Sequence, residues 1–158
     1  DDRDIIQTTN KIKEHGIYTI ANYIFGLPDD TQQSMQETLD LALEINAAWA
    51  NFYCTMAYPG SPLYNQAREK GWSVPNDPGG PGWIGYSQHG YESLPLPTNS
   101  LTSHEVLDFR DHAFEKYFSD PSFLSMIQNV FGTKVIDHIQ SMLEIKIKRK
   151  HRDPLETS

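Results

Sequence analysis

Cysteine is nearly absent from this 158-residue chain, which contains a single one, Cys54. One cysteine excludes a disulfide within the chain, and such chains are typical of a reducing compartment, which favours the cytoplasm. It also excludes an iron–sulfur cluster held by this chain alone, because such a cluster usually needs three or four thiolates. We therefore predict that Cys54 is a buried thiol that packs as a small apolar group.

Long apolar runs and positive charge are also scarce. No stretch reaches the 18 or so apolar residues of a membrane-spanning helix, so no membrane span is predicted. Asp and Glu number 21 and Lys and Arg 13, which gives a formal net charge of −8. An acidic chain is a poor partner for a phosphate backbone, so no nucleic-acid binding is expected. The basic run 146–152 is predicted to be a solvated helix end, with contact to an anion as the alternative.

What is present in the first 70 residues is an alternation of helical and strand patterns. Helices are predicted over 2–15, over 31–46 with Asp30 as N-cap, and from Ser61 to about 70, and strands over 17–25 and 49–57. Both strands are β-branched and aromatic with hardly a charge, which predicts strands covered on both faces. Short Gly- and Pro-containing turns after each strand indicate βαβ connectivity and parallel strands, and therefore an α/β fold.

Two strands do not make a stable sheet alone. Further strands are therefore expected from a longer protein or from another chain. An exposed sheet edge predicts a tendency to form a homodimer.

The rest of the chain changes character. Residues 71–101 are rich in glycine, proline and aromatic residues, which predicts an ordered loop packed by its own rings. A helical extension is predicted over 102–150, with helices over 103–119, from Pro121, and over 133–150. The first of these opens with a Thr-x-x-Glu capping box at Thr102 and Glu105, and residues 151–158 are expected to fray.

Polar side chains occur at alternate positions of both predicted strands. The shared faces hold Asn22, Ile24 and Gly26 on the first strand and Asn51, Tyr53 and Thr55 on the second. Because ligands of parallel α/β sheets bind at the carboxyl ends of the strands, these faces are candidate walls of a barrel lumen or cleft. The alternative is a buried strand whose few polar groups are satisfied internally.

Two motifs in order carry a family resemblance. Phe25-Gly26-Leu27-Pro28, followed by a helix, resembles the Gly-Leu-Pro signature of radical S-adenosylmethionine (radical SAM) enzymes. The segment from Tyr58-Pro59-Gly60 to Tyr64 resembles the loop after their next strand. The nearest resemblance is to the branch with an upstream cobalamin-binding domain, which includes oxidative cyclases and hopanoid methylases, and it covers about residues 1–70.

The resemblance implies that residues 1–70 are the second-half portion of a TIM-like partial (β/α) barrel. The whole enzyme would use S-adenosylmethionine and a 4Fe-4S cluster, with cobalamin as a further cofactor of that branch, and act on a small-molecule substrate. The family's Cys-x-x-x-Cys-x-x-Cys motif precedes this part of the barrel and is absent here. The chain is therefore expected to be a C-terminal part that is inactive alone and holds no tightly bound cofactor.

The resemblance also assigns roles by position. It implies cofactor contacts from Asn22, Ile24, Gly26, Leu27, Pro28, Tyr58 and Pro59, with Ile24 and Gly26 against the adenine. Asn51, Tyr53 and His89 are candidates for the substrate cavity. Asn22 stands where the family has glycine, and Asp29 where it has glutamate, which leaves a polar role of Asp29 in doubt. No catalytic residue and no metal ligand is assigned.

Two other classes of function stay open. The chain can be a self-contained α/β binding or interaction module without redox chemistry, in which Gly26-Leu27-Pro28 is a tight turn. It can also be a complete enzyme of unrelated type that uses His89 or a helix face. That face, which carries His104, Asp108, Asp111 and His112, is the weaker candidate for a metal site.

Overall fold

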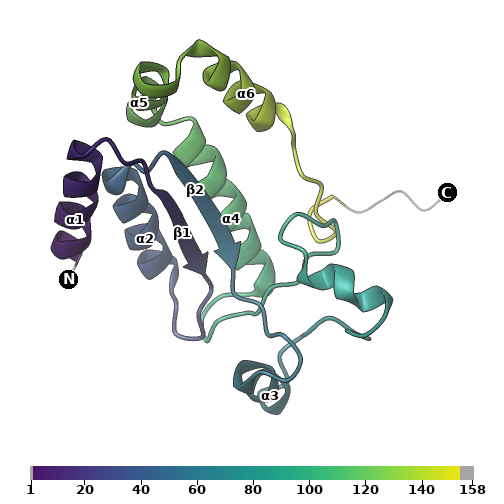
Figure 1. Ribbon diagram of the computed structural model, residues 1–158. Helices are drawn as coiled ribbons and strands as arrows, with labels where there is room; N and C mark the ends of the chain where they lie inside the picture. The colour runs from purple at the N-terminus through teal and green to yellow at the C-terminus, as the bar shows by residue number, and fades with distance from the viewer. Residues whose placement is uncertain (1, 154–158) are drawn as a thin grey trace. The chain divides into compact units, whose positions relative to one another are not determined.

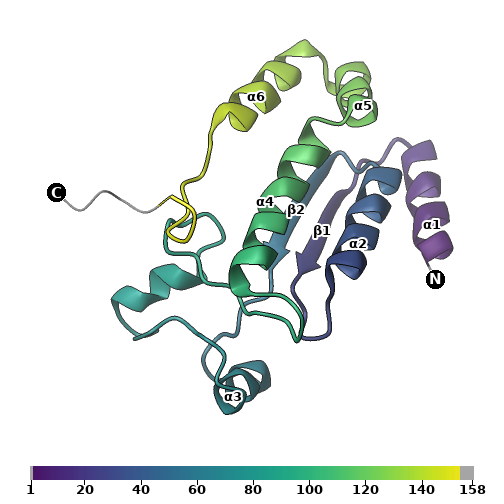
Figure 2. The same cartoon turned by 180° about the vertical axis from the view of Figure 1, so that it is seen from behind.

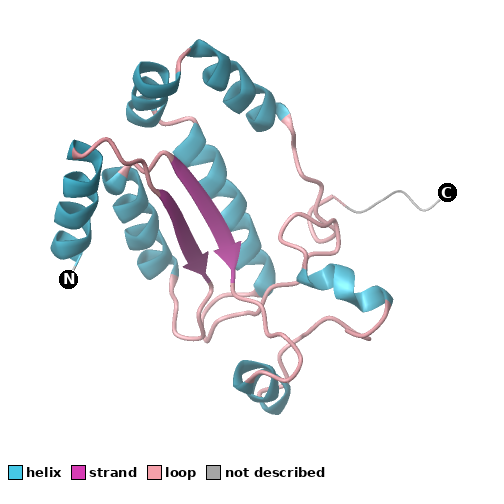
Figure 3. Ribbon diagram, in the orientation of Figure 1, coloured by secondary structure: helices cyan, strands magenta, loops and turns pink. Residues whose placement is uncertain are grey.

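The computed structural model describes residues 2–153. In chain order the elements are α1 (Asp2–Glu14), β1 (Ile20–Phe25), α2 (Gln32–Ile45), β2 (Trp49–Cys54), α3 (Pro62–Glu69), the 3-10 helix η1 (Pro81–Tyr86), α4 (Ser103–Phe118), α5 (Pro121–Phe131) and α6 (Thr133–Glu144) (Figure 1). Figure 3 shows the two strands side by side and pointing the same way, as one parallel pair. The prediction of a mixed α/β fold with parallel strands is confirmed for this part of the chain.

The helix starts follow the local signals in the sequence. Ser61 precedes α3 and its side-chain oxygen accepts a hydrogen bond from the Tyr64 N–H at 3.1 Å. Thr102 and Glu105 form the predicted capping box at α4: the Thr102 N–H donates to Glu105 Oε2 at 2.8 Å, and the Glu105 N–H donates to Thr102 Oγ1 at 3.2 Å. The Thr102 N–H and the Thr102 hydroxyl, which both donate to Glu105 Oε2, hold the pKa of Glu105 below its usual value, because they favour the carboxylate.

Several predicted boundaries were wrong. The strands are shorter than 17–25 and 49–57, and α2 begins at Gln32, two residues after the predicted cap Asp30. The last helix ends at Glu144, not at 150, and the backbone of Ile145 is extended (φ −76°, ψ 105°).

The prediction that both strands are covered on both faces was also wrong. In β1 and β2 buried residues alternate with exposed or half-buried ones, so one side of each strand is packed and the other is open. The open sides carry large apolar residues, with Ile20 66%, Ile24 52% and Tyr53 37% exposed. In Figure 1 β2 passes in front of α4, and in Figure 2, seen from behind, α4 passes in front of β2.

The chain divides into two compact units. The first contains the chain up to Tyr23, Gln33–Phe52 and Asp111–Ile145. The second contains Ile24–Gln32, Tyr53–Arg110 and the chain from Lys146 onward. Each unit has its own buried core.

The first unit has an aromatic core. Rings of Tyr23, Phe52, Tyr117 and Phe123 follow one another with centroid distances of 5.4, 5.6 and 4.9 Å. The buried Tyr117 hydroxyl donates to the Ala47 carbonyl at 2.7 Å. Because burial disfavours the phenolate, the pKa of Tyr117 lies well above its usual value, and the pKa of Tyr23 rises to about 12 for the same reason.

These two tyrosines allow a matched test of the core. Tyr117→Phe leaves the Ala47 carbonyl without its donor and is expected to lower the free energy of unfolding by about 1–3 kcal/mol. Tyr23→Phe removes a buried hydroxyl that has no hydrogen-bond partner within residues 2–153, so it is expected to be neutral or stabilising. Urea denaturation of both variants measures the difference, and equal losses contradict this account.

Candidate functional site

The turn after β1 is fixed by the carboxylate of Asp30. Its Oδ2 accepts hydrogen bonds from the N–H groups of Gly26 at 3.0 Å and Leu27 at 2.9 Å. Both amides of the Gly-Leu segment are therefore occupied by a side chain four or fewer residues away. A ligand at this turn meets the apolar side chain of Leu27, which is 52% exposed, and not these two amides.

A second segment holds the same turn from outside. The Asn99 N–H donates to the Pro28 carbonyl at 2.9 Å, and its Nδ2 donates to Asp29 Oδ1 at 2.8 Å. Lys70 Nζ donates in turn to Asn99 Oδ1 at 3.1 Å. Asp29, whose polar role the sequence left in doubt, thus has a structural partner 70 residues away in the chain.

Gly26 is required by packing as well as by conformation. Its φ is +81°, a region that residues with side chains rarely adopt. A Cβ built at this position lies 2.5 Å from Val106 Cγ1 in α4. Gly26 is the glycine that was predicted to lie against the adenine. On the side where a Cβ would project, the space beside it is filled by helix α4 of the same unit.

Gly60 provides a control for this double requirement, because its φ is +87° and nothing lies within 4 Å of a Cβ built there. Gly26→Ala and Gly60→Ala carry similar backbone strain, but only the first inserts a methyl group into packed space. We expect Gly26→Ala to lower the free energy of unfolding by about 1–3 kcal/mol more than Gly60→Ala. Val106→Ala should reduce that difference in the double variant, and a difference that persists unchanged contradicts the clash.

Among the remaining strand candidates Thr55 is buried, and its hydroxyl donates to the Phe25 carbonyl at 3.1 Å, whereas the others lie on open sides. In the second unit Ile24 and Tyr53 are exposed. In the first unit Asn51 Nδ2 donates to Asn22 Oδ1 at 2.9 Å, and Asn51 Oδ1 accepts from Trp49 Nε1 at 3.2 Å. The two asparagines are therefore neighbours on adjacent strands, as their positions predicted, and they orient each other.

Tyr58, predicted at the rim, belongs to an aromatic cluster. Its ring stacks on Tyr86 at 5.1 Å and lies 6.2 Å from Trp83, which is 5.1 Å from Tyr86. Tyr86 is buried and its pKa is raised, first by burial and then by Tyr64 and Tyr58. Tyr58 and Trp83 remain 47% and 55% exposed, and Pro59 is also exposed.

Sequence reasoning named neither Trp83 nor Tyr86 as a site residue. The signal that points to them is their spacing of three within the Pro- and Gly-containing segment 81–86, because residues i and i+3 of a 3-10 helix project to the same side. The cluster gives this unit a partly exposed aromatic surface beside the segment that follows β2.

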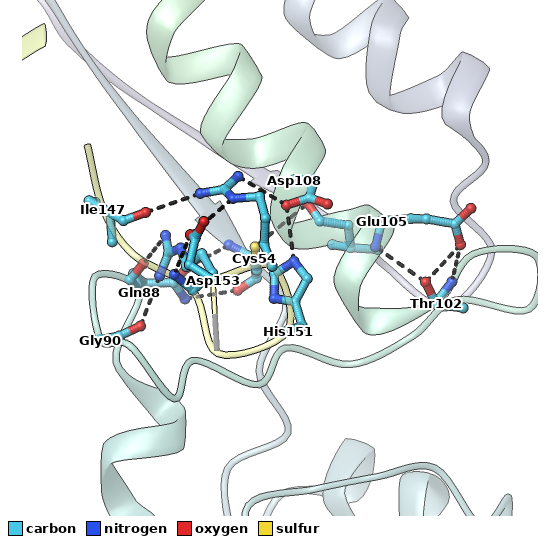
Figure 4. Close-up of polar contacts among 12 residues, drawn as sticks. Cys54, Gln88, Gly90, Thr102, Glu105, Asp108, Ile147, His151 and Asp153 are labelled. Carbon is cyan, nitrogen blue, oxygen red and sulfur yellow. Dashed lines mark hydrogen bonds and ion pairs between the residues drawn. The ribbon is translucent and has the colours of Figure 1, made fainter. Parts of the chain in front are cut away.

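The end of β2 is held by Gln88. Gln88 Oε1 accepts from the Cys54 N–H at 2.8 Å, and its Nε2 donates to the Cys54 carbonyl at 3.0 Å (Figure 4). A side-chain amide thus pairs with both backbone groups of the last strand residue, as a neighbouring strand does. His89, the residue named from the sequence, is exposed, and its neighbour Gln88 makes this contact.

The basic run 146–152 is not a solvated helix end. Arg149 in its centre is completely buried, and its guanidinium donates to the carbonyls of Gln88 and Gly90, each at 3.0 Å. Its own N–H donates to Asp153 Oδ2 at 3.1 Å. The stem and planar guanidinium of arginine suit this pair of carbonyl acceptors, which an exposed helix end does not provide.

Residues 151–153 of the predicted frayed tail also make defined contacts. His151 Nε2 and Arg152 lie 3.0 and 3.3 Å from Asp108 Oδ1, and the Asp153 carbonyl accepts from the Tyr91 hydroxyl at 3.2 Å. Residues 154–158 lie outside the described part of the chain. We call residues 146–153 the C-terminal segment.

Arg149 and Arg152 give a matched pair for testing this segment. Arg149→Lys keeps the charge but loses the two-carbonyl contact, so the loop that carries Gln88 should open more often and the Cys54 amide should exchange faster with solvent. A loss of about 1.5–3 kcal/mol in protection is expected. Hydrogen exchange measures it, with Arg152→Lys, whose side chain is 44% exposed, as the control. Equal exchange in both variants contradicts the proposed role of Arg149.

The candidate metal face does not form a site in the part of the chain that the structure describes. No three His, Cys, Asp or Glu side chains group there as metal ligands do, and Asp108 is paired with His151 and Arg152. None of the helices between residues 2 and 153 is long and apolar enough to cross a membrane.

Comparisons with known proteins give a partial likeness. No family model matches the chain. A 62-residue segment is 27% identical to a protein of Pyrococcus horikoshii described as an uncharacterized methyltransferase. The match covers 39% of this chain and 14% of that protein, so the chain spans a small part of the relative's length. The similarity is to part of a methyltransferase and does not extend to a family assignment.

Proposed function

We propose that this chain forms part of the wall of an S-adenosylmethionine and substrate cavity in a radical SAM enzyme. In this proposal β1 and β2 are strands from the second half of a partial (β/α) barrel. The observation that carries it is the one-sided packing of both strands, whose open sides expose large apolar residues at their carboxyl ends. The open side of a barrel strand faces the lumen, where ligands of such folds bind.

Two further observations support the proposal. The Gly-Leu-Pro and Tyr-Pro-Gly motifs both follow the carboxyl ends of parallel strands, as the resemblance implies. The partial likeness is to a methyltransferase, and radical SAM methylases are methyltransferases.

The residues around the first turn fit an adenosyl group by apolar contact. Ile24 and Leu27 are each 52% exposed, whereas the amides of Gly26 and Leu27 are bound to Asp30. Adenine would therefore pack against side chains here and find its hydrogen bonds elsewhere. When bound and reduced, S-adenosylmethionine supplies a 5′-deoxyadenosyl radical, and the role of this chain is to position it and exclude water.

The residues do not fit a 4Fe-4S cluster. Cys54 is 3% exposed and its backbone is bound to Gln88 at the end of β2. One buried thiol cannot replace the three thiolates that hold such a cluster. The cluster, and cobalamin where it is used, would be held by residues outside this chain, and we propose that the chain alone is inactive.

We assign the contacts with the substrate to residues at the rim of the cavity. Tyr58 and Pro59 would contact the substrate or cofactor, together with Asn51, Tyr53 and His89 as named from the sequence. The exposed ring of Trp83 extends the surface of Tyr58 and favours a substrate with an apolar or aromatic part.

The test begins with the gene on the 5′ side of the codon for Asp1. A Cys-x-x-x-Cys-x-x-Cys motif encoded within roughly 150 codons, by comparison with a barrel of about 250 residues, supports the proposal. The complete protein is then assayed for S-adenosylmethionine cleavage. Ile24→Ala is expected to weaken S-adenosylmethionine binding about tenfold, because one large apolar contact is lost.

Ile17→Ala is the matched control, since Ile17 is 58% exposed but precedes β1. It should leave binding unchanged. A complete protein without the cysteine motif, or equal effects of the two variants, contradicts the proposal.

A self-contained α/β module is the second candidate. The packing of Val106 against Gly26 favours it, because it gives the Gly-Leu-Pro turn a purely structural reason. A module predicts a stable monomer with one cooperative unfolding transition. The barrel proposal predicts association through the open sheet edge, for which sedimentation of the chain provides the measurement.

A further inference from the structure

The second unit contains a pocket that neither the resemblance nor the proposed function uses. Its volume is about 430 Å³, within the range of small-molecule sites. It is lined by Val74, Pro75, Asn76, Gly82, Gly85, Glu92, Ser93, Leu94, His104, Lys150 and His151. The apolar residues come from the loop 74–94, and both imidazoles and the ammonium come from α4 and the C-terminal segment.

The C-terminal segment brings a lysine and a histidine to this pocket of an acidic protein. Of the chain's 13 Lys and Arg residues, five lie between residues 146 and 153, a stretch that contains one acid. Lys150 is 66% exposed, and its Nζ lies 3.9 Å from Glu92 Oε1, whose side chain is 50% exposed. An exposed pair at this distance is weak, so Lys150 can exchange Glu92 for a ligand anion.

Ser93 supplies an unused hydrogen-bonding group. Its residue is 7% exposed, and its hydroxyl is buried without a partner in the part of the chain that the structure describes. Its backbone is fixed, because the Ser93 N–H donates to the Gly90 carbonyl at 3.2 Å. An unpaired buried hydroxyl lowers stability, and a ligand oxygen would satisfy it once the Ser93 side chain turns toward the pocket.

The two histidines form a flat wall. The rings of His104 and His151 are nearly parallel, at an interplanar angle of 8° and a centroid distance of 4.3 Å. Asp108 Oδ1 lies 3.0 Å from His151 Nε2 and orients that ring. The wall is thus positioned by side chains of α4 and of the C-terminal segment together.

We propose that this pocket binds the phosphate group of a small molecule through Lys150, Ser93 and the His104–His151 pair. An ammonium, a hydroxyl and imidazole groups that come from separate segments approach a ligand from several directions, which suits the tetrahedral oxygens of phosphate better than the planar oxygens of a carboxylate. The volume leaves room for the rest of the molecule against Val74, Pro75 and Leu94. This inference is independent of the radical SAM proposal.

The experiment titrates the 158-residue chain with inorganic phosphate at constant ionic strength and pH. Proton NMR of the histidine rings reports binding, with the signals of His104 and His151 assigned from single His→Gln variants. Saturable shifts of these two signals are expected. Lys150→Ala should weaken phosphate binding roughly tenfold or more, since a charged partner is lost. Lys148→Ala removes an exposed charge of the same segment that does not line the pocket and should have little effect.

Two variants separate a binding role from a structural one. Ser93→Ala should weaken phosphate binding while leaving the unfolding midpoint unchanged or raised, because it removes an unpartnered hydroxyl. Glu92→Gln should strengthen binding, because it removes the anion that competes for Lys150. If Ser93 has only a structural role, Ser93→Ala should lower the unfolding midpoint. If the Lys150–Glu92 pair has only a structural role, Glu92→Gln should not strengthen phosphate binding.

Three results would overturn the inference. The first is a set of shifts that does not saturate. The second is an equal loss in Lys150→Ala and Lys148→Ala, which would indicate attraction by net charge alone. The third is equal affinity for acetate and phosphate under the same conditions, which would remove the assignment to phosphate.

Discussion

The packing of helix α4 against the end of β1 sets the geometry of the second unit. Val106 occupies the space that a side chain at position 26 would need, so the chain can turn there only with glycine. Phe109, one turn further along α4, meets Phe25 edge-on at 5.1 Å. With the helix on that side, Phe25 is buried and Ile24 faces the open side. The side of the strand end that carries Ile24 is thus the side available to a ligand, because helix α4 covers the side that carries Phe25.

The structural requirement for glycine at position 26 is therefore compatible with a ligand on the opposite side of the turn. The glycine is needed for the fold whether or not a ligand approaches the opposite side of the turn. The Gly-Leu-Pro motif alone cannot distinguish a cofactor site from a structural turn for this reason. The exposure of Ile24 and Leu27 distinguishes them better, because packing within the unit does not require these side chains to be apolar.

Local signals predicted the helices well, and long-range contacts account for what was missed. The capping residues Ser61 and Thr102 act over three positions, so the sequence contains all that is needed to place their helices. The polar residues at alternate positions indicated which side of each strand lines a cleft. The exposure of Ile20, Ile24 and Tyr53 was not predicted, because apolar residues on both sides of a strand suggest full burial. The burial and contacts of Arg149 were not predicted, because its two acceptors lie about 60 residues away in a loop without a regular pattern.

The contacts of Arg149 connect two features that the sequence separates. Gln88 pairs by its side chain with Cys54 and by its carbonyl with Arg149, so the same residue joins the end of β2 to the C-terminal segment. The segment also carries Lys150 and His151 into the pocket. A ligand that orders the segment should therefore hold Arg149 more firmly and, through Gln88, protect the end of β2. Because ligand binding and local opening are linked equilibria, phosphate should slow hydrogen exchange at the Cys54 amide, and Arg149→Lys should weaken that coupling.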